Sequence, residues 1–579
     1  MKTKQLVQNA DRIVEEMLDG LVLAQPHLTL VEGEKVVLHR DFEAIRERQV
    51  TLLSGGGSGH EPAHAGYIGE GMLTGVICGN VFASPTTQQV LAAIRLVAGP
   101  KGCLIIVKNY TGDRINFGLA VEQAKAEGYI VDMVVIGEDA AVVNANAGRR
   151  GLSGTVYIHK LAGAAAAKGL SLSSIVDVVN KVATTETLGT IGVAIKPCTL
   201  PGHDGPSREL GPNEMELGLG IHGEPGIEKC ELEDAPVITN RMVERLAGAL
   251  SLQSSSKAVL MVNNLGASTT MELFVVAKHA IESLKRRGVV VERTVVGSFM
   301  TALDMSGFSL TVWKVDGNSE LLELFDAATT APAWNYSPFS TTAKPQSVKP
   351  VAAKSTAATF KRPAELSANA QLIEASIRAA SEALIASEPD LTAWDAKVGD
   401  GDCGHTFKCA AQKILADLES SYPLDNAGST LRALANSVSQ SAGGTSGVLY
   451  TIFITAAAVK MESFSSVSPV AWAASFVAGI DAVQRYGGAR EGSRTMLDAL
   501  LPAARALGDV STASDAEILA RLSAVVEAAE TGADKTSSIS TSKAFGRSGY
   551  VGDDNAAGVP DPGAKAAAIW IRAAVSKLK

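Results

Sequence analysis

Three aspartates in one short, glycine-containing segment are the residues most suited to chemistry. Asp395, Asp400 and Asp402 lie within eight residues of one another. Carboxylates this close repel one another unless a cation neutralises their charge. Hard divalent ions prefer oxygen ligands, and magnesium is usually shared between carboxylates and substrate phosphates. The segment therefore predicts a magnesium site that faces a phosphorylated ligand. A solvated acidic turn is the weaker interpretation, because Val398 and Phe407 indicate partial burial.

A second polar set, in the first half of the chain, suits a small ligand with a carbonyl group. The segment SGGGSGHEPAH (54–64) follows an expected strand, and its glycines would let the backbone approach a ligand closely. VKNYTGDR (107–114) also follows an expected strand, and open α/β sheets bind ligands at such strand ends. With His222 in a Gly-flanked turn, these segments supply histidines, a lysine, a carboxylate and backbone donors. Each segment taken alone also fits a structural turn.

Several glycine-rich segments in the second half are expected at helix ends. AGGTSG (442–447) precedes the apolar run VLYTIFITAAA, and small residues before a helix start favour phosphate binding at its N-terminus. Further turns are expected at 487–488, 492–496, 546–547 and 561–563. These turns could all lie together in a ring around one end of a helical bundle.

Two familiar motifs are interpreted as chance matches. HEPAH (60–64) fits a zinc pattern that requires a continuous helix, but it follows a run of glycines and contains Pro62. GLGIHG (218–223) fits the dinucleotide fingerprint, but Glu-Pro-Gly follows where a helix would have to begin. The phosphate-loop pattern is absent from the sequence, so a nucleotide would be held in another way.

The chain has two regions that differ in their pattern of apolar residues, and the helices and strands of these regions must position the residues named above. Up to residue 334, short apolar runs alternate with helical patterns, which predicts an α/β domain with a mainly parallel sheet. Strands are expected at 50–53, 104–107, 131–136, 192–195, 258–262, 289–296 and 310–315. From residue 364 onward the pattern is helical, which predicts a bundle of about eight helices.

The stretch between the two regions predicts a domain boundary. It is rich in Ser, Thr, Ala, Lys and Pro and contains no Asp or Glu, which favours a linker, although a loop over the surface fits equally well. We therefore expect an α/β domain at 1–335, with subdomains at about 1–185 and 186–335, a linker at 336–363, and a helical domain at 364–579.

Net charge, cysteine spacing and the distribution of apolar residues argue against several classes of protein. The 579 residues carry a net charge of −9, which argues against nucleic-acid binding. The six cysteines are scattered and form no Cys-x-x-Cys pair, so a reducing compartment is expected. The N-terminal segment lacks the apolar core of a secretory signal, and no run of about 18 apolar residues predicts a membrane span. A cytoplasmic location without membrane partners is the expectation.

Seven motifs together resemble the dihydroxyacetone kinases: SGGGSGHEPAH, VKNYTGDRINFG, GLGIHGEPG, MVNNLG, DAKVGDGDCG, GGTSG and DPGA. The resemblance covers nearly the whole chain apart from the expected linker. It implies an α/β sugar-binding domain followed by an all-α antiparallel helical barrel that binds nucleotide. The one-chain order is similar to the ATP-using branch, which implies ATP-dependent phosphorylation of dihydroxyacetone, and of glyceraldehyde as well.

The resemblance also implies roles for individual residues. His222 would form a hemiaminal with the substrate carbonyl, Asp113 would act as base, and His60 would assist by hydrogen bonding. The remaining implied sugar contacts are Lys108, Gly57, Ser58 and Gly59.

In the second domain the resemblance implies a metal and nucleotide site. Asp395, Asp400 and Asp402 would hold two magnesium ions, with manganese as an alternative, and no organic prosthetic group is implied. The implied ATP contacts are Asp402, Cys403, Gly404, His405, Thr406, Gly444, Thr445, Ser446, Gly487, Arg494, Thr495, Met496, Arg547, Asp561, Pro562 and Gly563.

Two other functions stay open at this point. The chain could bind the sugar as a sensor or co-activator without turnover, although the aspartates and the helical half argue against this. It could also split FAD to cyclic FMN at the same nucleotide site, as some animal members of the family do. The resemblance implies a homodimer through the sugar-binding domain. The two halves of the active site could meet within one chain or across a dimer.

Overall fold

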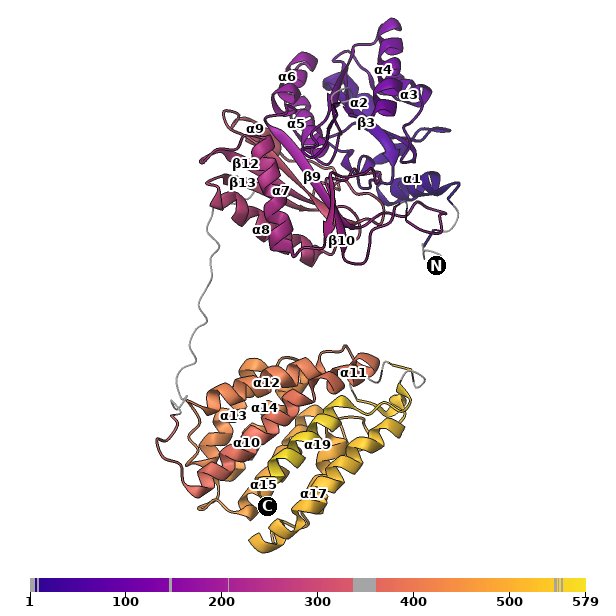
Figure 1. The fold of residues 1–579 in the computed structure, drawn as a ribbon. Coiled ribbons are helices and arrows are strands. Elements are labelled where there is room, and N and C mark those ends of the chain that lie inside the picture. Colours follow the sequence, from indigo (N-terminus) through magenta and orange to yellow (C-terminus); the bar gives the residue numbers. More distant parts are fainter. Residues whose placement is uncertain are drawn as a thin grey trace. The chain divides into compact units, whose positions relative to one another are not determined.

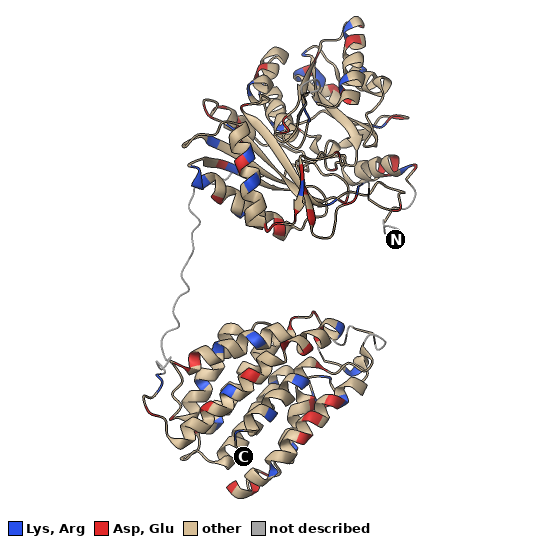
Figure 2. Cartoon of the chain, viewed as in Figure 1, with Lys and Arg blue, Asp and Glu red and all other residues tan. Residues whose placement is uncertain are grey.

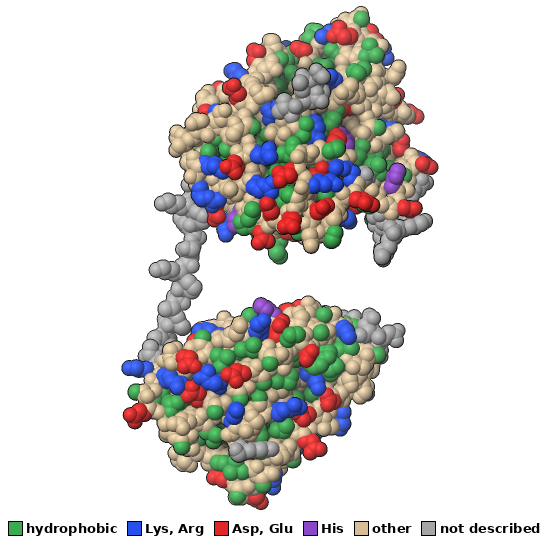
Figure 3. Space-filling model, viewed as in Figure 1, with side chains coloured by type: hydrophobic (Ala, Val, Ile, Leu, Met, Phe, Trp, Pro, Cys, Tyr) green, Lys and Arg blue, Asp and Glu red, His purple; other side chains and the backbone are tan. Residues whose placement is uncertain are grey.

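The computed structural model describes residues 6–7, 10–144, 148–206, 208–336, 361–545, 549, 551–552 and 556–578. The chain divides into two compact units, Met1–Val348 and Lys349–Lys579 (Figure 1). Lys, Arg, Asp and Glu are distributed over the helices and strands of both units (Figure 2). On the face that Figure 3 shows, basic and acidic side chains are interspersed within each unit.

The first unit begins with a six-stranded sheet in the order β1-β2-β4-β3-β5-β6. The four strands β4, β3, β5 and β6 pair in parallel, whereas β1 and β2 pair antiparallel at one edge. The strand bounds are β1 Leu28–Leu30, β2 Val36–His39, β3 Thr51–Ser58, β4 Gly75–Val81, β5 Cys103–Lys108 and β6 Val131–Ile136.

Alternate residues of the central strands face two different helical layers. Ile105 and Val107 of β5 pack with α3 and α4, whereas Leu104 and Ile106 pack with α5 and α6. Because both faces of the strand are covered, its sequence is continuously apolar. The helices of this half are α1 Ile13–Ala24, α2 Phe42–Arg48, α3 Thr87–Val97, α4 Thr111–Ala126, α5 Thr155–Ala167 and α6 Leu172–Val182.

A second six-stranded sheet follows, in the order β11-β10-β9-β14-β12-β13. Helices α7 and α8 share one apolar core with this sheet, whereas α9 and α5 share the core on its other side. The elements are β9 Leu188–Lys196, β10 Glu214–Leu217, β11 Glu228–Glu231, α7 Ala235–Ala249, β12 Lys257–Asn264, α8 Thr270–Arg286, β13 Val290–Gly297, β14 Ser306–Lys314 and α9 Leu321–Asp326. A short hairpin, β7 Val143–Asn144 and β8 Gly148–Arg149, precedes α5.

The predicted fold class is confirmed, and each of the seven predicted strands overlaps an observed one. Two details differ from the prediction. Parallel pairing prevails among the central strands of the first sheet, but in the second sheet only β12 and β13 pair in parallel. In addition, β3 continues through the glycines to Ser58, where we expected a turn after residue 53. A Cβ atom at Gly55 would lie 2.2 Å from the Ile77 carbonyl oxygen, so the strand passes too close to β4 for a larger residue.

The second unit is a ring of antiparallel helices. Each neighbouring pair packs together from α12 through α17, α17 packs on α19, and α10 closes the ring by contacting both α19 and α12. The helices are α10 Ala368–Ala386, α11 Glu388–Val398, α12 Cys403–Leu418, α13 Ala427–Ser441, α14 Gly444–Glu462, α15 Pro469–Gly487, α16 Leu497–Ala506, α17 Asp515–Lys535 and α19 Pro562–Val575. Short α11, which the sequence pattern did not predict, carries Asp395.

The interior of this ring is apolar. A cavity of about 630 Å³ is lined mainly by aliphatic and aromatic side chains, among them Phe407, Tyr450 and Trp472. Helix α14 is long and apolar enough to cross a membrane, a property that core helices of soluble proteins share. Because α14 packs against both α13 and α15, we interpret it as a core helix of the bundle.

Candidate active site

Lys108 and Asp113 converge on the glycine strand of the first unit. Lys108 is the last residue of β5, and Asp113 lies in the first turn of α4. A Cβ atom at Gly56 would lie 3.5 Å from both Asp113 Oδ2 and Lys108 Cε, so the absence of a side chain there keeps the space between them open. Both side chains are buried, and Ser84 Oγ donates a 2.5 Å hydrogen bond to Asp113 Oδ1.

His222 lies in a box of three rings that come from separate segments. Its ring centroid is 4.7 Å from His60, 4.7 Å from Tyr110 and 5.1 Å from Phe82, each in an edge-to-face arrangement. His60 is itself stacked on Phe82 at 5.1 Å. The three predicted catalytic residues therefore belong to one unit, and the structure brings His222 and His60 into direct ring contact.

Glu224 orients the His222 ring. Its Oε1 is 2.8 Å from His222 Nδ1, and its Oε2 accepts a 2.9 Å hydrogen bond from the His222 backbone N–H. Burial raises the pKa of Glu224, but the hydrogen bonds from His222 outweigh this effect and lower the pKa to about 2. A carboxylate that accepts a hydrogen bond from Nδ1–H keeps the proton on Nδ1 and leaves the Nε2 lone pair available as a nucleophile.

Three buried polar atoms around the ring box lack a hydrogen-bond partner among the described residues: His60 Nε2, Lys108 Nζ and Tyr110 Oη. His60 Nδ1 lies 2.8 Å from the Thr301 carbonyl oxygen and must donate to it, so Nε2 is an acceptor. Burial and the nearby Lys108 and His222 hold the pKa of His60 well below its usual range, and burial lowers the pKa of Lys108. Unsatisfied buried polar groups of this kind suit a small polar ligand.

The remaining predicted sugar contacts are also found at this place. Gly57 lies against the backbone of Phe82 and Ala83, since its Cβ would come within 2.9 Å of both. Ser58 Oγ donates to the Gly79 carbonyl oxygen, and the Gly59 N–H donates to Glu61. The hydroxyl of Ser58 and the N–H of Gly59 thus already have partners within the protein.

Sequence reasoning missed several residues of this site. Glu224 lies two residues after His222 in the motif GLGIHGEPG, so this spacing could have identified it. Tyr110 lies within the segment VKNYTGDR, between Lys108 and Asp113, so its place in that segment could have identified it. Phe82 and Ser84 carry no comparable signal, because tertiary packing alone brings these side chains beside His222 or Asp113.

The three predicted metal ligands come together in the second unit. Asp395 lies on α11, Asp402 directly precedes α12, and Asp400 lies in the loop between these helices. One carboxylate oxygen of each lies within 4.8 Å of the other two. Asp395 Oδ2 accepts a 3.0 Å hydrogen bond from the Cys403 N–H, which ties the carboxylate to the start of α12. This cluster of oxygen ligands fits a divalent cation.

Several predicted nucleotide contacts lie at helix N-termini, where backbone N–H groups favour phosphates. Cys403 and Gly404 begin α12, Gly444 begins α14, and Asp561 caps α19 by accepting a 2.7 Å hydrogen bond from the Ala564 N–H. Thr406 and Ser446 both line the edge of the central cavity. Burial raises the pKa of Asp561 to about 7; Arg494 opposes this, and Asp498 and Asp395 add to it.

The remaining predicted ATP contacts come from several segments of the second unit. Pro562 and Gly563 form the first turn of α19, and the Gly563 Cβ position lies 3.8 Å from the Met496 nitrogen, so these two turns are adjacent. His405 and Thr445 are exposed, Gly487 ends α15, and Arg547 lies outside the described residues.

Arg494 and Thr495 have partners within the protein. The buried Arg494 guanidinium donates to the carbonyl oxygens of Ile539 and Val559, and Nε is left without a partner within the described ranges. The Thr495 N–H donates to Asp498. Arg494 therefore joins the turn at 492–496 to the two chain segments that contain Ile539 and Val559.

Comparisons with known proteins match both units of the chain. A Dak1 domain matches residues 19–333, and a DAK2 domain matches residues 397–576. The chain is 44% identical to a triokinase/FMN cyclase of Homo sapiens over the full length of both, and 36% identical to a dihydroxyacetone kinase of Citrobacter freundii over 97% of each. The crystal structure of the C. freundii kinase with AMP-PNP and Mg²⁺ matches with a TM-score of 0.65, 34% identity and 99% coverage of each chain. These matches span both halves of the chain, which is therefore a member of the dihydroxyacetone kinase family.

Proposed function

We propose that this protein phosphorylates dihydroxyacetone with ATP. The observation that carries the proposal is the placement of His222: Glu224 orients its ring within a box of His60, Phe82 and Tyr110. Relatives named dihydroxyacetone kinase and triokinase support the same activity. The cluster Asp395, Asp400 and Asp402 supports a nucleotide site on the second unit.

In the first step, His222 Nε2 attacks the carbonyl carbon of the sugar. A carbon–nitrogen bond forms, the carbonyl π electrons move to oxygen, and that oxygen takes up a proton from the solvent to become a hydroxyl group, which leaves the ring as an imidazolium. Glu224 stabilises the positive charge that develops on the imidazole ring. The resulting hemiaminal fixes the sugar and excludes glycerol, which has no carbonyl group. Because an aldehyde forms the same adduct, we expect glyceraldehyde to be a substrate as well.

In the second step, the terminal hydroxyl of the bound sugar attacks the γ-phosphate of ATP. A phosphorus–oxygen bond to the sugar forms, the bond between the γ-phosphorus and the β,γ-bridging oxygen breaks, and ADP leaves. Asp113, positioned by Ser84, accepts the hydroxyl proton, and Lys108 and His60 hold the sugar oxygens through their free polar atoms. Magnesium, two ions in our proposal with manganese as an alternative, supplies charge neutralisation on the phosphates. Asp395, Asp400 and Asp402 would hold the ions. The N-termini of α12 and α14 would direct backbone N–H groups at the phosphates.

The two domains proposed here have the boundaries expected from the sequence: 1–335 for the sugar and 364–579 for the nucleotide. Phosphoryl transfer requires the two sites to meet, within one chain or between the subunits of a homodimer. A cytoplasmic location fits an enzyme that uses ATP and small soluble sugars.

The proposal is tested by two measurements on the same preparation. We expect intact-mass spectrometry under native conditions, or difference density in sugar-soaked crystals, to detect dihydroxyacetone bonded to His222. We also expect ATP and Mg²⁺ to convert the sugar to its phosphate. His222→Ala should weaken sugar binding and loosen discrimination against glycerol. An adduct without turnover would favour a sensor, and turnover with unchanged selectivity in His222→Ala would refute the role of His222.

A second activity, cleavage of FAD to AMP and cyclic FMN, is proposed because four full-length relatives are named triokinase/FMN cyclase. The reaction would use the same acidic cluster, with manganese as the favoured ion. Incubation with FAD and Mn²⁺, followed by chromatography, tests it. The absence of cyclic FMN under conditions in which the kinase is active would remove this proposal.

A further inference from the structure

We propose that Arg150, held by Asp139, is a positioning residue that fixes the loop carrying His222 and thereby sets the affinity for the carbonyl substrate. The inference rests on the proposed role of His222. The loop, residues 218–226, joins β10 to β11 in the second sheet. Arg150 and Asp139 come from the segment between β6 and α5, which belongs to the first half of the unit.

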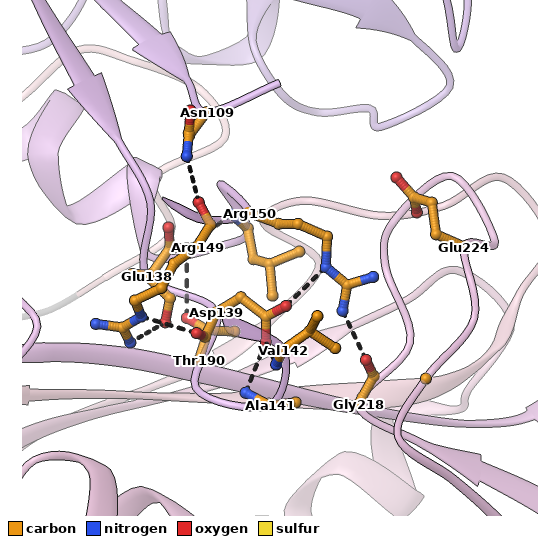
Figure 4. Close-up of polar contacts among 12 residues, drawn as sticks. Asn109, Glu138, Asp139, Ala141, Val142, Arg149, Arg150, Thr190, Gly218 and Glu224 are labelled. Atoms are coloured by element: carbon orange, nitrogen blue, oxygen red, sulfur yellow. Dashed lines mark hydrogen bonds and ion pairs between the residues drawn. The ribbon is translucent and has the colours of Figure 1, made fainter. Parts of the chain in front are cut away.

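Arg150 spans the distance between these two parts with its guanidinium group. Its Nε donates a 2.7 Å hydrogen bond to Asp139 Oδ2, and its Nη2 donates a 2.7 Å hydrogen bond to the Gly218 carbonyl oxygen (Figure 4). Gly218 is the first residue of the loop. The Arg150 side chain is 16% exposed and that of Asp139 is 1% exposed, so water competes poorly for either bond.

Asp139 is itself immobilised, which makes it a firm anchor. Its Oδ1 accepts hydrogen bonds from the backbone N–H groups of Ala141 at 2.8 Å and Val142 at 3.4 Å (Figure 4). The backbone of this segment is joined to β9, since the Ala140 N–H donates to the Thr190 carbonyl oxygen at 2.7 Å. The guanidinium of Arg150 therefore has one fixed position from which to reach the loop.

The neighbouring Arg149 makes contacts of a different kind. Its side chain donates to the carbonyl oxygens of Glu138, Asp139 and Leu188, all within the framework around β9. None of these contacts reaches the loop 218–226. Arg149 thus holds the framework together, whereas Arg150 connects that framework to the loop.

The loop itself leaves room for this arrangement only because residue 220 is glycine. A Cβ atom at Gly220 would lie 2.1 Å from Glu224 Oε2 and 2.8 Å from Arg150 Nη1. The guanidinium and the carboxylate that orients His222 therefore approach the same point of the loop backbone. Figure 4 shows Arg150 between Asp139 and the loop that bears Gly218 and Glu224.

The far end of the loop has a separate anchor. Glu216 Oε1 accepts a 2.8 Å hydrogen bond from the Gly226 N–H. At the near end, Gly218 is held by its N–H, which donates to the Gly192 carbonyl oxygen at 2.7 Å, and by Arg150 at its carbonyl. Removing Arg150 would take this donor away from the Gly218 carbonyl and from Asp139 Oδ2, so the start of the loop should shift while its end stays in place. A displacement of about 1 Å in a reacting group can reduce a rate about 100-fold.

The experiment compares Arg150→Met and Asp139→Asn with a matched control, Arg293→Met, in the full-length protein. Arg293 forms a similarly buried pair with Asp326, at 2.6 Å, that touches neither site. Both test variants should raise the KM for dihydroxyacetone about ten-fold or more and lower the fraction of protein that carries the sugar adduct. The KM for ATP should stay within about two-fold of the wild-type value. Arg150→Lys, which keeps the charge and one donor, should restore part of the affinity.

The outcomes separate this inference from the proposed function. If the wild-type protein forms no adduct, the role of His222 fails first. If the wild type forms the adduct and Arg150→Met and Asp139→Asn form it equally well, the positioning role is refuted. An equal rise in both KM values, or the same loss in Arg293→Met, would also refute it, since that result indicates general destabilisation. Hydrogen exchange should increase in residues 218–226 of Arg150→Met and not in the control.

Discussion

Glu138 should make the stability of the first unit depend on pH, and replacing it by glutamine should remove that dependence. Its side chain is 1% exposed. Its Oε1 accepts hydrogen bonds from the N–H groups of Leu152 and Gly154 at 2.9 and 2.8 Å, whereas Oε2 has no partner in the described part of the chain. Burial raises the pKa of Glu138 from 4.5 to about 7, against the opposing effect of these bonds and of Arg149.

The sign of the effect follows from this pKa. The folded protein binds the Glu138 proton more tightly than the unfolded chain does, so the stability that this proton provides is complete below pH 4.5 and is lost as the pH rises through 7. The difference between the two pKa values corresponds to about 3 kcal/mol in total. Between pH 5 and pH 8 the loss amounts to about 2 kcal/mol.

Hydrogen exchange in peptides that cover β5 and α5 measures the unfolding free energy of this unit separately from the helical one. The advantage of the wild type over Glu138→Gln should be about 2 kcal/mol smaller at pH 8 than at pH 5. Glu323→Gln, at a side chain that is 77% exposed, is the control. The difference in unfolding free energy between this variant and the wild type should be the same at pH 5 and pH 8. An equal difference between wild type and Glu138→Gln at both pH values would show that the folded protein does not hold this proton.

Three further predictions concern the two sites. Asp402→Ala should abolish phosphorylation yet leave the sugar adduct intact, and adduct loss detected by mass spectrometry would contradict the separation of the sites. Glu224→Gln should raise the KM for dihydroxyacetone about ten-fold or more, because the ring loses the carboxylate that orients it; an unchanged KM would refute that role. Gly404→Ala places a Cβ 2.3 Å from the Glu388 carbonyl oxygen. This substitution should lower the stability of the helical unit by about 1–3 kcal/mol in thermal unfolding, and a wild-type Tm would contradict it.

Structural features that are set by residues close together in the sequence were predictable from the sequence alone. The three aspartates lie so close along the chain that any compact loop keeps their carboxylates together, and the structure places them within 4.8 Å. Helix starts at Gly444 and Pro562 follow from small residues and proline, which suit the first turn of a helix. The apolar runs that predicted strands reflect burial on both faces of a sheet, a requirement visible residue by residue.

Arrangements that join distant segments depended on the tertiary structure. The box around His222 combines Phe82 after β4, Tyr110 before α4 and His60 after β3, and no spacing along the chain relates these positions. The same holds for Arg150, whose partner carbonyl at Gly218 is 68 residues away. Short strands such as β10 and the edge strand β11 were missed, because their pairing comes from the adjacent strand and not from their own composition. Sequence therefore determined which chemical groups this protein carries and where seven of its strands and most helices of the second unit form, but it did not predict β4, a central strand of the first sheet. Packing between the two halves of the first unit decided which of those groups lie together, since long-range contacts alone set that geometry.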